Sequence, residues 1–275
     1  MPYEPLTTDR LLPTDAVRYH LLYKDTCRGP GDPENDGTHI HNYYEIYVNL
    51  SGDVGFLVGD RYYKVQSGDM ILTRPGELHV CVYNQFCRHM HFCLWIEAPA
   101  NSPLVSFMHA PDFDNCLSFD EEEKRLLIRL FQELDQQAAD AILLRTALLC
   151  RIMEQLSKPV RRQQAEQDLP EEFRQILTYL NGHFRQIQYI HEIYDRFYVS
   201  HATLNRWFRK YLGISPREYL ESQKLAYARK LLEEQCTVTE TAGRAGFSDC
   251  SYFIAVFKKR FGVTPLIWQH SLEMR

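Results

Sequence analysis

Long apolar runs are missing from this sequence. No stretch approaches the ~18 consecutive apolar residues that a membrane-spanning helix requires, so the sequence predicts no integral membrane protein. The N-terminus also lacks a basic patch followed by an apolar core, which is the pattern of a secretion signal. We therefore expect a cytoplasmic protein that does not use a membrane as a partner.

Paired cysteines are missing as well. The chain has eight cysteines, but no two form a Cys-x-x-Cys pair, which argues against a zinc ribbon, a thioredoxin motif and a dense disulfide framework. We expect buried, reduced thiols instead. The content of 45% hydrophobic and 24% charged residues is ordinary for a globular protein, and 275 residues suggest two or three domains.

Positive charge is scarce in the first part of the chain. Residues 1–169 carry 16 Lys and Arg against 25 Asp and Glu, a net charge of −9. Residues 170–275 carry 15 against 11, a net charge of +4. An acidic half joined to a basic half favours a C-terminal segment that binds nucleic acid.

The residue pattern divides the chain into three successive segments. From about Tyr19 to Glu97, short aromatic and β-branched segments are separated by turn residues, which is typical of a sandwich or barrel. From about Asp120 to Ser157 the apolar period is helical, and these two helices either pack on the barrel or form a dimer seam. The predicted fold class is α+β multidomain, with a β-barrel at 1–118, a helical dimerisation region at 119–158, a linker at 159–169 and an all-α domain at 170–275.

The basic half contains an internal duplication. Residues 208–216 (FRKYLGISP) align with residues 257–265 (FKKRFGVTP) at an offset of 49, whereas upstream residues align at an offset of 48. One extra residue therefore lies in the turn of the second copy, next to Gly246. Each copy predicts two helices joined by a short turn, with Ser200 as the N-cap in the first copy and Ser248 or Asp249 in the second.

The second helix of each copy has a buried aromatic stripe and an outer face that is polar and partly basic. Such a helix after a tight turn suits the major groove, where Asn reads adenine, Arg reads guanine, and Ala or Ile contacts a thymine methyl group. A helical hairpin repeat without a ligand is the alternative, but two copies in the basic half favour DNA binding. The predicted DNA-facing residues are His201, Ala202, Asn205, Arg206, Arg209, Cys250, Ser251, Ile254, Ala255 and Lys258.

This half resembles the AraC/XylS family of bacterial transcription regulators over about residues 172–270. The motifs GFSD, SYF, FKK, FG and TP between Gly246 and Pro265 look like the signature of that family. The resemblance implies two helix-turn-helix units that enter successive major grooves. The sequence departs from the family at Tyr194 and Thr241 in the supporting helices, and at Ile254 and Ala255, which make the second recognition helix more apolar.

Histidines and a glutamate gather in the acidic half. His39, His41, Tyr43, Glu45 and Tyr47 alternate, so a strand would place all five on one face. Together with His79, the histidines and Glu45 form a candidate site for Zn, Ni, Mn or Fe. The spacing resembles the cupin fold, which implies a double-stranded β-barrel with His39, His41, Glu45 and His79 pointing inward. A metal-free pocket, in which the histidines bond a sugar or a buried carboxylate, is the alternative.

Aromatic residues in the predicted barrel strands are candidates for binding an effector, because aromatic faces stack on sugar rings. The predicted effector-binding residues are Tyr43, Tyr47 and Trp95, with Arg74 and Glu77 at the rim. His89 and His91 also alternate and either line the wall or face solvent, and we do not expect them to be ligands.

These features predict a ligand-responsive, sequence-specific DNA-binding transcription regulator that senses a sugar or another small polar metabolite and is not an enzyme. The expected partners are double-stranded DNA, the effector, a second copy in a homodimer, and RNA polymerase. One alternative is a metal-dependent cupin enzyme with a helical appendage. Another is a DNA-binding protein whose barrel serves only as a dimer scaffold.

Overall fold

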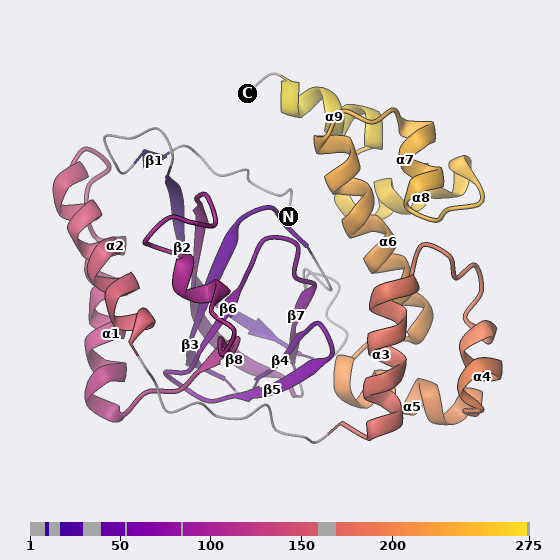
Figure 1. Cartoon of the computed structure of the whole chain (residues 1–275), viewed down its shortest axis with the longest axis horizontal. Helices are drawn as coiled ribbons and strands as arrows, with labels where there is room; N and C mark the ends of the chain where they lie inside the picture. Colours follow the sequence, from indigo (N-terminus) through magenta and orange to yellow (C-terminus); the bar gives the residue numbers. More distant parts are fainter. Residues whose placement is uncertain are drawn as a thin grey trace.

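A computed structural model describes residues 9–10, 17–29, 40–52, 54–83, 85–158 and 169–273. Its N-terminal part is a β-barrel made of two sheets (Figure 1). One sheet has six strands in the order β1-β2-β8-β3-β6-β9, and the other has three in the order β5-β4-β7. The strands are β1 (Asp9–Arg10), β2 (Arg18–Arg28), β3 (Tyr44–Ser51), β4 (Val54–Val58), β5 (Arg61–Val65), β6 (Met70–Thr73), β7 (His79–Tyr83), β8 (Cys87–Glu97) and β9 (Cys116–Leu117), and a short 3₁₀ helix, η1, spans Ser106–His109.

Alternation along the strands separates the inside of the barrel from its outside. Tyr47 of β3 packs in the inner cluster with Phe56 of β4, whereas Ile46 and Val48 belong to the outer cluster shared with helices. Because successive side chains on a strand point to opposite faces, Glu45 lies on the inner face with Tyr47. The strand begins at Tyr44, which is later than the alternation from His39 predicts. His41 and Tyr43 therefore enter the barrel from the segment before the strand.

Helices α1 (Glu121–Asp135) and α2 (Ile142–Ser157) lie along the side of the barrel that faces away from the C-terminal half (Figure 1). Asp120 caps α1, because its carboxylate accepts hydrogen bonds from the backbone N–H groups of Glu122 and Glu123. Leu130 and Phe131 of α1 and Ile152 of α2 are buried in the outer cluster of the barrel. One face of each helix is thus used for packing on the barrel.

The C-terminal half is all-α and contains the predicted duplication. Its helices are α3 (Glu171–His183), α4 (His191–Phe197), α5 (His201–Leu212), α6 (Pro216–Glu233), α7 (Val238–Arg244), α8 (Cys250–Phe261) and α9 (Pro265–Glu273). Ser200 caps α5 and Asp249 caps α8, 49 positions apart, whereas the left-handed turn residues Tyr198 and Gly246 lie 48 apart. The extra residue of the second copy therefore lies between Gly246 and Asp249. Within the described ranges, no helix is both long and apolar enough to cross a membrane.

The two halves share one apolar cluster. It joins the outer face of the three-stranded sheet, including Leu57 and Val80, to Phe173 of α3 and Tyr211 of α5. Asp60 accepts a hydrogen bond of 2.7 Å from the hydroxyl of Thr178 at the same boundary. Leu169, which the sequence places in the linker, is buried in this cluster, and residues 159–168 of the predicted linker lie outside the described residues.

Candidate effector site and nucleic-acid interface

Two histidines and one carboxylate meet inside the barrel. His41 Nε2 lies 2.8 Å from Glu45 Oε2, and His79 Nε2 lies 3.3 Å from the same oxygen. The side chains of all three residues are buried, and their ligand atoms lie within 4.8 Å of one another. The structure therefore brings together three of the four residues predicted to bind a metal. The fourth, His39, lies outside the described residues.

Backbone carbonyl groups fix the protonation of both rings. His41 Nδ1 donates to the carbonyl oxygen of Tyr43, and His79 Nδ1 donates to that of Glu77, each at 2.9 Å. Because a neutral imidazole carries only one N–H, Nε2 of each ring is then an acceptor. An ionised carboxylate also only accepts, so with both rings neutral three acceptors converge at one point. A proton on Nε2, which makes that ring a donor to Glu45, or a bound cation relieves this repulsion.

Protons on the rings or a metal ion can supply this positive charge. Burial lowers the pKa of His41 despite its hydrogen bond to Glu45, which opposes a charged ring. Burial acts to raise the pKa of Glu45, but hydrogen bonding to the two histidines holds it well below its usual range, so Glu45 is ionised. Imidazole ligands whose other nitrogen donates to a carbonyl are typical of metal centres. The residues therefore fit a borderline divalent metal.

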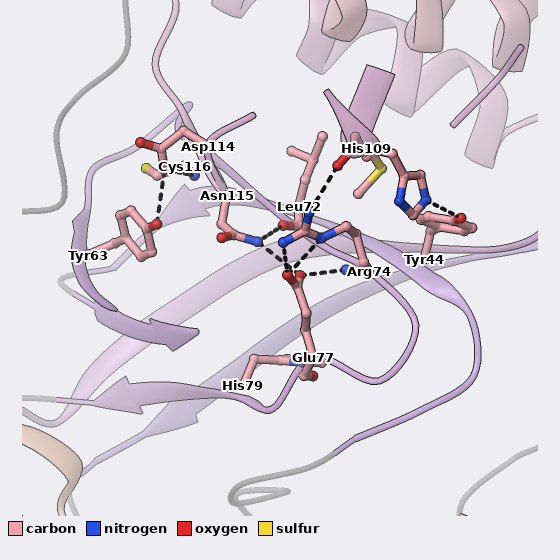
Figure 2. A network of polar contacts seen from close by, with 11 residues as sticks. Tyr44, Tyr63, Leu72, Arg74, Glu77, His79, His109, Asp114, Asn115 and Cys116 are labelled. Carbon is pink, nitrogen blue, oxygen red and sulfur yellow. Dashed lines mark hydrogen bonds and ion pairs between the residues drawn. The ribbon is translucent and has the colours of Figure 1, made fainter. Parts of the chain in front are cut away.

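The turn after β6 carries a network of polar contacts next to His79 (Figure 2). Arg74 Nε donates to Glu77 Oε1 at 2.7 Å, and Asn115 Nδ2 donates to Glu77 Oε2 at 3.0 Å. The Glu77 side chain is thereby fixed, while its carbonyl oxygen holds His79. Arg74 and Glu77, which the sequence predicts to contact the effector, neutralise each other in this state.

A second polar group lies further along the inside of the barrel. His89 and His91 of β8 are buried, and their rings stack with centroids 4.4 Å apart. Tyr47 from β3 hydrogen-bonds His89, and the Tyr83 ring from the other sheet lies 5.1 Å from it. Burial lowers the pKa of His89 to about 4 and that of His91 to about 3, so both rings are neutral. Of the two alternatives for these histidines, the structure selects the inner wall.

The predicted aromatic effector residues also face the interior. Tyr43 stacks on His41 with ring centroids 3.8 Å apart, and it lies 5.5 Å from the Trp95 ring. Tyr47 is buried, and burial raises the pKa of its phenol well above the ordinary value, so it is uncharged. The contact of these residues with an effector stays a prediction.

The first recognition helix, α5, presents its predicted face to solvent. His201, Ala202, Arg206 and Arg209 are exposed, and Asn205 is partly exposed. Two of these side chains have intramolecular partners: Asn205 Nδ2 donates to the carbonyl of His201 at 2.8 Å, and Arg209 Nη1 donates to the carbonyl of Gly213 at 3.2 Å. The base contacts of Asn205, Arg206 and Arg209 stay predictions.

The second recognition helix, α8, is less polar. Ser251, Ala255 and Lys258 are exposed, whereas Cys250 and Ile254 are half-buried. Tyr252, which the sequence leaves outside the predicted face, donates to Glu221 of α6 at 2.6 Å and accepts from Arg217 at 3.3 Å. In the supporting helix α7, Thr241 is buried, and its hydroxyl has no hydrogen-bond partner among the described residues.

Comparison with known proteins covers both halves. Residues 31–153 match the model of the AraC-like ligand binding domain, and residues 193–271 match the model of a helix-turn-helix domain. The chain belongs to the AraC family of transcription regulators. This AraC-family chain thus joins a barrel that matches a ligand-binding domain to a helical half that matches a helix-turn-helix domain.

The AraC-family relatives include two named activators. The HTH-type transcriptional activator RhaR of Enterobacter sp. strain 638 is 23% identical over 84% of this chain and 86% of its own length. RhaS of Escherichia coli K12 is 29% identical over 82% of this chain and 85% of its own length. These names give the alternative of a metal-dependent enzyme no support.

Solved structures also match this AraC-family chain. A crystal structure of ToxT from Vibrio cholerae O395 is 12% identical with a TM-score of 0.37, and it covers 94% of this chain and 99% of its own. The C-terminal domain of AraT, a response regulator from Geobacillus stearothermophilus, is 28% identical with a TM-score of 0.36, and it covers 38% of this chain and 88% of its own.

Proposed function

We propose that this regulator activates transcription in response to a sugar or another small polar metabolite bound in the barrel. The observation that carries the proposal is the buried polar set of His41, Glu45 and His79 in a chain that also exposes two recognition helices. An interior built only as a scaffold would be apolar, because burying polar groups is costly.

The response is a shift between populations. The barrel and the DNA-binding half can be arranged in more than one way. An effector that binds one of these arrangements more tightly than the others increases the population of that arrangement, and only this difference in affinity drives the change. In a homodimer, the favoured arrangement places both DNA-binding halves on their half-sites and leaves the bound protein next to RNA polymerase.

The DNA contact is tested on Arg206. Arg206→Ala should weaken specific operator binding by roughly 1–3 kcal/mol if the side chain makes a bidentate contact with a guanine. Arg125→Ala, an exposed position on α1, is the matched control and should leave operator affinity unchanged. Gel-shift titration and footprinting measure both variants. An unchanged affinity and footprint for Arg206→Ala and Asn205→Ala combined would contradict the assignment of this face.

We also propose that His41, Glu45 and His79 hold a divalent metal ion, which would supply fixed positive charge at the point where three acceptors meet. Elemental analysis of the purified full chain should find close to one transition-metal ion per chain. Glu45→Gln should lower this content, because an amide is a weaker metal ligand than a carboxylate. Full thermal stability and an intact effector response after chelation would favour the metal-free pocket instead.

A further inference from the structure

The two helix-turn-helix units have separate apolar cores. The first core contains Ile193 of α4, Phe208 of α5 and Tyr219 of α6. The second contains Leu225 of α6 and Phe253 of α8, and the two cores have no described residue in common. The orientation of one unit relative to the other therefore depends on α6 and on the contacts that cross between the units.

A buried lysine lies on α6 between the two cores. Lys224 is 5% exposed, and its Nζ donates to the carbonyl oxygen of Ile187 at 2.8 Å and to that of Gly246 at 2.7 Å. Ile187 belongs to the first core, and Gly246 lies in the turn between α7 and α8. Lysine is rarely buried unless it is paired, and its ammonium group only donates. One side chain thus bonds the backbone of both units.

The backbones of the two units approach each other closely at this point. A Cβ atom at Gly246 would lie 2.3 Å from the carbonyl oxygen of Arg185, which belongs to the segment before α4. Gln188 Nε2 also donates to the Gly246 carbonyl, at 3.5 Å, and Lys224 Nζ lies 5.7 Å from the centroid of the Phe247 ring. A side chain at Gly246 would push the segments apart, so the glycine allows both carbonyl groups to reach Lys224.

Both bonded carbonyl groups are connected to a recognition helix. The turn with Gly246 leads into α8, whose N-cap is Asp249. Ile187 precedes α4 and shares its core with Phe208 of α5. A shift of either carbonyl group relative to α6 would therefore move the recognition helix of that unit.

Other polar contacts between α6 and the recognition helices are exposed. Arg209 of α5 lies 3.7 Å from Glu218, and both side chains are more than half exposed. Tyr252 of α8, which bonds Glu221, is 41% exposed. Exposed ion pairs contribute little because water screens them, whereas removing Lys224 would leave two buried carbonyl groups without this donor. Lys224 is thus the strongest of these contacts.

The relation between the helices matters because DNA is a helix. One added base pair moves a subsite by about 3.4 Å along the duplex and turns it by about 35° around the axis. Two recognition helices held at a fixed distance and rotation therefore fit one spacing of their subsites, and a pair that can tilt fits several.

We infer that Lys224 fixes the distance and rotation between α5 and α8, and so sets the spacing of the two DNA subsites that the chain reads. It is a positioning residue, which acts through the backbone of Ile187 and Gly246. The inference rests on the proposed reading of DNA by α5 and α8, and it is independent of the effector.

A series of variants removes the donors of Lys224 stepwise. Lys224→Arg retains two donor groups, Lys224→Gln retains one on a shorter side chain, and Lys224→Met retains none at a similar length. Lys224→Gln provides the test if Lys224→Met does not fold. Lys230→Met is the matched control, because it makes the same change on the same helix at a side chain that is 43% exposed.

The probe is the duplex that the unmodified full chain selects from a random library. It is compared by gel-shift titration with versions in which one base pair is inserted or deleted between the two subsites. The unmodified chain should bind the altered versions about tenfold more weakly, because one recognition helix loses its register. Lys224→Met should reduce this preference to about threefold or less, whereas Lys224→Arg and Lys230→Met should retain it.

The ratio of two affinities separates positioning from stability. A variant that only lowers the folded fraction weakens binding to all duplexes equally and leaves the ratio unchanged. The inference is overturned if both Lys224→Met and Lys224→Gln retain the full preference, or if Lys230→Met loses it as well.

Two outcomes distinguish this inference from the proposed function. If the unmodified chain selects duplexes with a single subsite, the proposed reading of DNA by both helices fails, and the inference fails with it. If the spacing preference depends on Lys224 but no sugar or small polar metabolite changes the output of a reporter gene, the inference stands and the proposed function fails.

Discussion

Tyr198 and Gly246 occupy equivalent turns of the two helix-turn-helix units, and both have positive φ, of 49° and 86°. The two positions differ in their surroundings. Tyr198 is 96% exposed, whereas a Cβ atom at Gly246 would lie 2.3 Å from the carbonyl oxygen of Arg185. Left-handed backbone is costly for any residue with a Cβ. At the second turn the Cβ would also overlap the backbone of Arg185, so only the first turn has room for a side chain.

The two turns should respond in opposite directions to substitution. Tyr198→Gly should raise the free energy of unfolding by up to about 1 kcal/mol, because it relieves left-handed strain at an exposed site. Gly246→Ala should lower it by about 1–3 kcal/mol from backbone strain, with the steric overlap adding to this. Gly243→Ala is the control: nothing lies within 4 Å of its added Cβ on α7, and alanine favours the helix. Urea unfolding followed by circular dichroism would contradict this account if Gly246→Ala behaved like Gly243→Ala.

Acid should destabilise the barrel through His89 and His91. Burial lowers the pKa of both, and the positive charges of Arg28 and Lys24 lower that of His89 further. In the unfolded chain these rings bind protons near pH 6.5 while the folded ones stay neutral, so stability is complete above that pH and is lost as the pH falls. Each ring should contribute a loss of about 1.4 kcal/mol per pH unit between pH 6 and 4. His91→Phe should reduce the slope of melting temperature against pH, and an unchanged slope would show that His91 binds protons equally in the folded and unfolded chain.

At the scale of the element, α2 has two different faces. Leu149, Ile152 and Leu156 are buried against the barrel. On the other side, Leu143 is 87% exposed, and it begins a stripe that continues through Ala147, Cys150 and Glu154. These positions are spaced four, three and four residues apart, so they share one face of the helix. This stripe, on the side of the barrel away from the DNA-binding half, favours α2 as the contact with a second copy.

Cys150 lies in the middle of that stripe and provides the test. In a chain with Cys27→Ser, which removes the other exposed thiol, a short bismaleimide should cross-link two copies through Cys150. Leu143→Glu should abolish the cross-link and weaken dimerisation, because a charge would be buried at the contact. Analytical ultracentrifugation measures the dimer. A monomer at all concentrations, or a dimer indifferent to Leu143→Glu, would exclude this seam.

At the scale of the whole molecule, the barrel and the DNA-binding half are coupled through direct contacts. Asn42, between the inner-facing His41 and Tyr43, donates to Glu233 at the end of α6 at 3.0 Å. Burial raises the pKa of Glu233, and α6 is the helix that joins the two helix-turn-helix units. The segment that contacts the candidate effector site on one side thus contacts the DNA-binding half on the other.

Undocking the halves should be possible without unfolding either. Leu57→Glu removes a buried apolar side chain from the shared cluster, which should weaken the association between the two halves by roughly 1.5–3 kcal/mol. The new carboxylate lies in water once the halves separate. Small-angle X-ray scattering should then show a larger radius of gyration with unchanged helix content. Lys64→Glu, an exposed position on neighbouring β5, is the control for added negative charge. Equal scattering curves for both variants would argue that the halves are not held together by this cluster.

The sequence by itself determined the order of the elements, the duplication and the outer face of α5, because helical and strand periods and capping residues are local. It also indicated His41, Glu45 and His79, because the alternation of side chains along the chain is a local property that the folded structure retains. Only the tertiary structure decided that Arg74 and Glu77 bond each other, that His89 and His91 face inward, and that Thr73 of β6 pairs with Glu45 of β3. These facts depend on strand register and on the contact between two sheets, which join residues far apart in the chain. The docking of Leu57 against Phe173 was decided in the same way, because an apolar residue on a strand does not reveal which partner covers it.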